Sequence, residues 1–181
     1  MAETLAGIGR RERGLVVLAG VVPDVDGFGL PFELATRDGD HPLLWWSEYH
    51  HALGHNLLFA LIVSAIAAVL SGTRRMAVAL MAFATFHLHL LGDLVGSRGP
   101  DGYEWPIPYL YPFSERPQLT WSGQWALNAW PNILLTIVLL AATFVLAWKR
   151  GYSPVGLIST RADQAFVRTL QARFRRRIRR I

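Results

Sequence analysis

The sequence contains no cysteine. This absence excludes disulfide bonds and thiolate metal sites, so a bound metal ion would need histidine, aspartate, glutamate or backbone ligands. Charged residues are also scarce, at 17% of the chain, whereas 52% of the residues are apolar and the mean hydropathy is +0.27. This composition is more apolar than that of an ordinary soluble domain. The 181 residues suffice for one domain and are too few for two domains of ordinary size.

The sequence also lacks an internal repeat and a recognisable cleavable signal peptide. An apolar run at residues 14–22 follows basic residues, but Pro23 and Asp24 come directly after it, without a small-x-small cleavage pattern. We therefore expect this run to remain in the protein. It is too short to span a bilayer alone, so we expect it to extend backwards, to dip into the bilayer or to pack against other helices.

Long apolar stretches predict membrane helices, because about 20 mostly apolar residues cross a bilayer. Residues 130–148 meet this requirement without a charge, and residues 76–95 meet it with two histidines and an aspartate near one end. Residues 56–70 are long enough only if their helix begins near Trp46. A polar turn at residues 71–75 predicts an antiparallel helical hairpin. The predicted fold is all-α: a polytopic membrane bundle of three to four helices.

Positive charge is unevenly distributed, with arginine crowding residues 161–181, and the net charge is +5. A basic chain can bind nucleic acid or an anionic membrane surface, and the apolar stretches favour the membrane. Apolar residues in this tail recur at roughly helical spacing, which predicts a basic amphipathic helix on an anionic leaflet. A disordered tail is the alternative. We therefore divide the chain into a membrane domain, residues 1–152, and a basic cytoplasmic tail, residues 153–181.

The basic residues also predict an orientation, since positive charge marks the cytoplasmic side. Arg74, Arg75, Lys149, Arg150 and the tail can all lie on that side, because two predicted spans separate the two pairs. This arrangement predicts a multi-pass protein with a cytoplasmic C-terminal tail. Membrane lipids are its expected partners, and an oligomer is compatible with the sequence.

Three short stretches carry side chains that can bind a metal ion. They are Asp24 and Asp26 after a proline, the run from His50 to His55, and His89 with Asp93. An ionisable residue within a membrane segment is costly and is a functional hypothesis by default. Imidazole and carboxylate ligands in one pocket suit Zn, Mn or Fe. We expect one or two divalent ions, with Zn or Mn preferred.

Helical geometry ranks these candidates in part. Residues four apart share a helix face, which pairs His89 with Asp93 and His51 with His55. His50 and His55 would diverge by about 140° on an ideal helix, so His50 faces the same site only if it precedes the helix. His87 lies about 160° round the helix from His89 and is expected to be structural.

The Asp-x-Asp stretch and His41 each have an interpretation that does not involve a metal ion. An Asp-x-Asp after a proline is usually a turn or a helix cap, and His41 is expected to be solvated in a polar loop. If an ion does bind, it lowers the pKa of bound water, and a nearby carboxylate can act as general base. Asp26 is one candidate for that role, and Glu48 is another on proximity in sequence.

The order of these motifs resembles a known family. Pro-Asp-x-Asp, then two histidines before an apolar helix, then His-x3-Asp and Pro-Phe-Ser, is similar to the bacterial membrane-bound metal-dependent hydrolases called YdjM-like or LexA-binding inner-membrane-associated hydrolases. The matching residues are Pro23 to Asp26, His50 to His55, His89 to Asp93, and Pro112 to Ser114. The resemblance covers about residues 14–148 and implies a location in the bacterial inner membrane.

The resemblance also implies roles for individual residues. The implied metal ligands are Asp24, Asp26, His50, His55, His89 and Asp93. The resemblance favours His50 over His51 as a ligand, against the helical geometry. We therefore expect His51 and Ser114 to contact the ligand side chains without binding the ion. Gly54 and Asn56 depart from the family pattern, and no histidine precedes His41.

The expected function is therefore metal-dependent hydrolysis. A similarity of the helical His/Asp arrangement to zinc phospholipase C and P1-type nucleases implies a phosphoester substrate, with a phospholipid as one example. Two other function classes remain open. One is a non-catalytic membrane regulator or scaffold that acts through the basic tail, and the other is a small metal or proton transporter.

Overall fold

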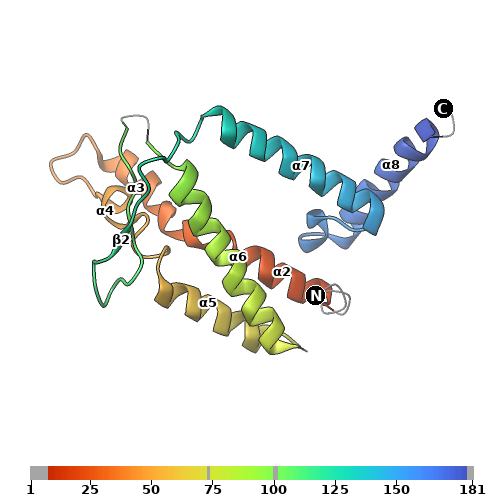
Figure 1. The fold of residues 1–181 in the computed structure, drawn as a ribbon, viewed down its shortest axis with the longest axis horizontal. Coiled ribbons are helices and arrows are strands. Elements are labelled where there is room, and N and C mark those ends of the chain that lie inside the picture. The colour runs from red at the N-terminus through yellow and green to blue at the C-terminus, as the bar shows by residue number, and fades with distance from the viewer. Residues whose placement is uncertain (1–7, 73, 100–101, 179–181) are drawn as a thin grey trace. The chain divides into compact units, whose positions relative to one another are not determined.

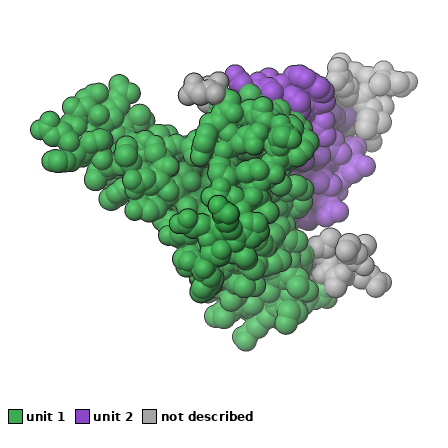
Figure 2. Space-filling view, turned by 60° about the vertical axis from the view of Figure 1, so that its left-hand side comes forward, with its two compact units in different colours: residues 1–127 green, residues 128–181 purple. Residues whose placement is uncertain are grey.

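The computed structural model describes residues 8–72, 74–99 and 102–178, and these residues are mostly helical (Figure 1). The chain divides into two compact units, Met1–Leu127 and Asn128–Ile181, shown in green and purple in Figure 2. The domain boundary predicted at residue 152 lies inside the second unit. The two units are described separately.

Three helices form the centre of the first unit. These are α2 (Arg10–Ala19), α5 (Leu57–Leu70) and α6 (Arg75–Gly96), which lie side by side. Helices α5 and α6 form the predicted antiparallel hairpin. Small side chains allow the close approach of the three helices, and the innermost cluster consists of Ala19, Ala67, Val78 and Ala82.

The helix that contains residues 57–70 does not begin near Trp46, the start that would have made it long enough to span. Helix α4 (Trp45–Tyr49) ends before the histidines, and α5 begins only at Leu57. The Asn56 side chain accepts a hydrogen bond from Phe59 N–H and donates to the carbonyls of Ala52 and Leu53. Asn56 therefore caps α5 and fixes a non-helical segment before it. We call this segment, residues 50–56, the histidine loop.

Proline, glycine and aspartate are frequent in residues 23–42, which predicts irregular structure, yet the segment contains two short helices. Element η1 (Val22–Phe28) is a 3-10 helix that carries both aspartates, and α3 (Gly29–Thr36) follows it. Together with α2, this run is apolar enough to cross a membrane only as a pair of helices bent by 53°. The predicted backward extension of residues 14–22 through the arginines is present as α2.

The prolines and aromatic residues of residues 97–122 predict an ordered loop, and the described part of this segment, which follows α6, is one. It contains an antiparallel pair of very short strands, β1 (Ile107–Pro108) and β2 (Gln118–Leu119). Leu57 N–H donates to the Tyr109 carbonyl, and Ile107 is fully buried beside Phe86. The loop is thereby attached to the ends of α5 and α6 that lie next to the histidine loop.

The second unit consists of α7 (Trp130–Arg150), the short 3-10 helix η2 (Pro154–Leu157) and α8 (Thr160–Ile178). Phe166 and Phe174 of α8 contact Phe144 and Trp148 of α7. The predicted tail helix is confirmed up to Ile178, and residues 179–181 lie outside the described part. The alternative of a disordered tail is wrong.

The predicted all-α membrane fold is confirmed. Among the described residues, α6 and α7 are long and apolar enough to cross a membrane, and the bent pair adds a third span if it counts as one. Helix α5, with 14 residues, is shorter than a full span.

Close helix packing predicts a sensitive position in α6. Ala82 is fully buried among small residues, so Ala82→Leu should lower the free energy of unfolding by about 1–3 kcal/mol through overpacking. Ala84→Leu, on the exposed face of the same helix, is the matched control and should have little effect. Thermal unfolding in detergent measures both variants, and equal shifts would contradict the packing.

Candidate metal centre

Four predicted ligand side chains meet where η1, the histidine loop and α6 come together. We call this group the cage: Asp24, His55, His89 and Asp93. His89 Nε2 lies 3.3 Å from Asp24 Oδ1, 3.1 Å from Asp93 Oδ2 and 3.4 Å from His55 Nε2. His55 Nε2 lies 3.7 Å from Asp24 Oδ1 and 3.4 Å from Asp93 Oδ2.

These five separations match the edges of a metal coordination tetrahedron. Four ligands at bond lengths of about 2.1 Å stand about 3.4 Å apart in a regular tetrahedron. The five measured distances run from 3.1 to 3.7 Å. The ligand atoms of Asp24, His55 and His89 all lie within 4.8 Å of one another, as do those of His51, His55 and Asp93, so either group has the dimensions to hold one divalent ion.

The outer nitrogens of both cage histidines are held by acceptors. His89 Nδ1 lies 3.0 Å from the Gly20 carbonyl, and His55 Nδ1 lies 3.2 Å from Asp26 Oδ2. Because a carbonyl or carboxylate oxygen only accepts, each Nδ1 must carry the hydrogen. The Nε2 atoms can then present their lone pairs to the cage. This arrangement is the usual way in which proteins orient a metal-binding histidine.

Asp26 lies behind His55. Its carboxylate accepts from His50 Nδ1 at 2.9 Å, from Gly54 N–H at 2.9 Å, and from His55. The side chain is 1% exposed, and both oxygens are occupied by these contacts. The structure thus places Asp26, predicted as a ligand and as a base, in contact with a ligand and outside the cage.

His50, expected from the resemblance to be a ligand, lies outside the ligand groups, and His51, expected only to contact the ligands, lies in one of them. His50 stacks on Trp46 and binds Asp26, whereas His51 belongs with His55 and Asp93 to a group whose ligand atoms lie within 4.8 Å of one another. His51 reaches this position because its backbone is left-handed, with φ of 69°. Its Nδ1 is buried without a hydrogen-bond partner, and Asp93 Oδ2 is buried against the Nε2 atoms of His55 and His89. A buried polar atom without a partner is costly in the absence of an ion or water, so the His51 nitrogen fits a metal site.

The comparison with protein families agrees with the motif order. The model of the YdjM inner membrane protein family matches residues 4–163. The chain belongs to this family. Neither the curated proteins nor the solved structures contain a match. Family membership and the apolar helices together place the protein in a membrane.

Two histidines of the histidine loop, His51 and His55, have pKa values shifted in opposite directions. Burial, with repulsion from His55 and His50, lowers the pKa of His51 to about 4, so His51 is neutral at pH 7. Burial alone would also lower the pKa of His55, but contacts with the cage aspartates and Asp26 outweigh it and raise the pKa to about 10. Without an ion, a proton on His55 therefore balances part of the carboxylate charge.

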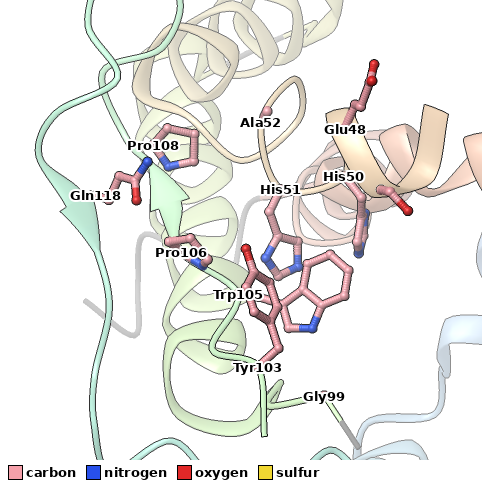
Figure 3. A pocket seen from close by; sticks show the side chains of 11 residues that line it. Glu48, His50, His51, Ala52, Gly99, Tyr103, Trp105, Pro106, Pro108 and Gln118 are labelled. Carbon is pink, nitrogen blue, oxygen red and sulfur yellow. The ribbon is translucent and has the colours of Figure 1, made fainter. Parts of the chain in front are cut away.

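Two predicted site residues lie away from the cage. The Ser114 hydroxyl donates to the Arg116 carbonyl at 2.7 Å and so stabilises its own turn. Glu48 is exposed on α4, and Figure 3 shows its carboxylate pointing away from His50 and His51. His87 is bound to the Phe83 carbonyl and to the Tyr109 hydroxyl, consistent with a structural role.

Sequence reasoning missed the two backbone groups that support the cage. The Gly20 carbonyl orients His89, and Gly54 N–H binds Asp26. Neither group carries a side-chain signal. Gly54 has a steric role as well, because a Cβ there would collide with the Pro23 carbonyl oxygen. Glycine at this position, one of the departures from the family pattern, thus permits the histidine loop to contact η1.

The contact between the histidine loop and η1 predicts the effect of a single methyl group. Gly54→Ala should lower the free energy of unfolding by about 1–3 kcal/mol, because the loop must move away from Pro23. Gly92→Ala in α6 is the matched control: no atom lies within 4 Å of its Cβ, and alanine favours a helix. Thermal unfolding in detergent distinguishes them. An unchanged Gly54→Ala midpoint would contradict the close contact.

Proposed function

We propose that this protein is a divalent-metal-dependent hydrolase of the bacterial inner membrane that cleaves a phosphoester. The supporting observation is the cage, in which the Nε2 atoms of His55 and His89 lie 3.4 Å apart and each lies 3.1–3.7 Å from an oxygen of Asp24 and of Asp93. Asp24, His55, His89 and Asp93 would hold the ion, with zinc preferred for this geometry and ligand set. When bound, such an ion lowers the pKa of water and polarises an ester oxygen.

The cage dimensions favour one ion over two. Ions in a two-metal site stand about 3.5–4 Å apart and need separate ligand sets. Here the two groups of potential ligands share His55, whose Nδ1 is already bound to Asp26. His51 therefore serves the same ion as the cage, either as a further ligand or through a water molecule.

Each residue of the site has a distinct task in this proposal. The two cage aspartates balance the charge of a divalent ion, and Asp26 and the Gly20 carbonyl hold the imidazoles in the binding tautomer. His51 is neutral and its Nδ1 has no partner, so it can accept a hydrogen bond from water beside the ion. The Asp24 side chain is 56% exposed and marks the side from which water and substrate enter.

The distribution of polar residues favours an enzyme over a transporter. A transport path would need polar groups along the length of the bundle. Residues 76–86 of α6 and residues 57–70 of α5 contain no ionisable side chain. The ligand atoms instead gather at one end of these helices. Their convergence also argues against a scaffold, which has no need of buried histidines and aspartates in contact.

We further propose a multi-pass topology with the C-terminal tail in the cytoplasm. The α2 N-terminus, with its arginines, lies beside the α5–α6 turn, since a Cβ at Gly72 would be 3.7 Å from Glu12 Oε1. The arginines of both segments thus lie at the end of the first unit opposite the cage. Positive charge at that end fits a cytoplasmic location, and the arginines of α8 suit an anionic leaflet.

The topology can be tested by cysteine labelling, because the chain has no native cysteine. Arg74→Cys and Lys149→Cys should react with a membrane-impermeant thiol reagent only after the cytoplasmic side is made accessible. Leu127→Cys, before α7, should react from the other side. Labelling of Arg74→Cys and Lys149→Cys from opposite sides would contradict the proposed number of spans.

The catalytic proposal is tested with Asp93→Asn, which keeps the side-chain shape and removes a negative charge from the cage. We expect it to fold and insert, to bind zinc at least about tenfold more weakly, and to lose turnover of a phosphoester. The control is Asp38→Asn, at a carboxylate whose side chain is 91% exposed. Metal content and product release are measured on the same samples.

The two readouts separate the parts of the proposal. If Asp93→Asn binds as much zinc as the wild type, the cage is not the metal site. Equal turnover in Asp93→Asn and wild type, at matched expression, would mean that this site does not perform the chemistry. A scaffold predicts that Asp93→Asn changes neither zinc content nor turnover, and alters only the contacts of Asp93 Oδ2 with the Nε2 atoms of His55 and His89.

A further inference from the structure

A pocket of about 450 Å³ opens beside the cage (Figure 3). Its wall is formed by the end of α4, the histidine loop, the segment around Tyr103 and Trp105, and the β1–β2 pair. His51 lines this pocket and also lies in the ligand group with His55 and Asp93. The volume is in the range of ligand pockets, about 300–1,000 Å³. His51 therefore connects the pocket wall with the candidate ion site.

Aromatic rings make up much of the pocket wall. The Tyr103 and Trp105 rings are nearly perpendicular, at 79°, with centroids 5.6 Å apart. The Trp105 ring also lies 5.2 Å from that of His51, and Figure 3 shows these side chains gathered at one side of the pocket. Two perpendicular rings can turn their faces to one ligand group from two sides, as in aromatic sites that bind ammonium ions.

The charges of the pocket wall also favour a cationic ligand. None of the eleven described residues that line the pocket is lysine or arginine, whereas Glu48 is among them. The two cage aspartates already balance the charge of a divalent ion, so the ion adds no net positive charge to its surroundings. The described wall therefore offers an anionic group no lysine or arginine as a counter-charge, while its ring faces attract a cation.

We propose that this pocket binds an ammonium-bearing group of the substrate, while the ester of the same molecule lies at the cage. This inference rests on the proposed function and adds the substrate class: an ester whose alcohol part carries a positive charge. Ser47 and Gln118, which also line the pocket, can accept hydrogen bonds from a primary ammonium.

The test uses three soluble phosphate monoesters that differ in the charge of the attached group: phosphocholine, glycerol 3-phosphate and 3-phosphoglycerate. Binding to the zinc-loaded full chain in uncharged detergent is measured by calorimetry, with inorganic phosphate as the reference for binding at the ion. Phosphocholine should bind about tenfold more tightly than glycerol 3-phosphate, as a desolvated cation–π contact allows. 3-Phosphoglycerate should bind most weakly.

Variants of the wall assign this preference to the pocket. Trp105→Leu should reduce the preference for phosphocholine to less than about twofold, with zinc content and phosphate binding unchanged. Tyr103→Leu, at a side chain that is 59% exposed, should reduce it partly without disturbing the fold. Trp121→Leu is the matched control, since Trp121 lies in the same loop and does not line the pocket.

The outcomes distinguish this inference from the function on which it rests. If the wild type binds zinc and phosphate but binds the three esters equally, the pocket proposal is overturned and the metal centre stands. The pocket proposal is also overturned if both Trp105→Leu and Tyr103→Leu keep the full preference. If the wild type binds no zinc, the proposed function fails, and the pocket proposal fails with it.

Discussion

The carboxylate of Asp26 holds together the elements on which the site depends. It joins η1 to the histidine loop through His50, Gly54 and His55, three contacts made by one buried side chain. The polypeptide between these elements is long and contains α3 and α4, so local structure alone does not bring them together. A buried carboxylate with all its acceptors used is stable where a partly satisfied one is not. The positions of His55 and of Asp24 both follow from this network.

The first unit has an apolar end, where α5 and α6 approach their connecting turn, and a polar end that contains the cage. The α5 and α6 residues near their connecting turn pack through alanine and valine, without ionisable groups. Close packing of small side chains gives a rigid frame, because such helices have little room to shift. The polar residues then gather at the other end, where the backbone is irregular and supplies additional hydrogen-bonding groups. Rigid helices and a polar loop are the combination that holds ligands at fixed separations.

The sequence predicted the helices that depend on long apolar runs, namely α6, α7 and the hairpin turn before α6. It also predicted the residue types of the site, because histidine and aspartate are rare beside membrane spans. It did not predict the break before α5. That break depends on Asn56 capping the helix with its side chain, whereas the apolar pattern alone favoured a longer helix. The preference for His50 over His51 came from the family resemblance, whereas helical spacing paired His51 with His55. The structure groups His51 with His55 and Asp93, through a loop with a left-handed residue and not through a helix.

The bend between α2 and η1 has a consequence for the chemistry of His89. In an uninterrupted α-helix, each carbonyl accepts the N–H four residues ahead, and Gly20 would be bound to Asp24. Here α2 ends at Ala19, and the N–H of Asp24 turns to Val21 instead. The Gly20 oxygen is left to accept from His89, as terminal carbonyls of helices commonly do with other groups. Straightening this segment into a regular span would thus release His89 to rotate, and would disable the centre without altering any of its ligands.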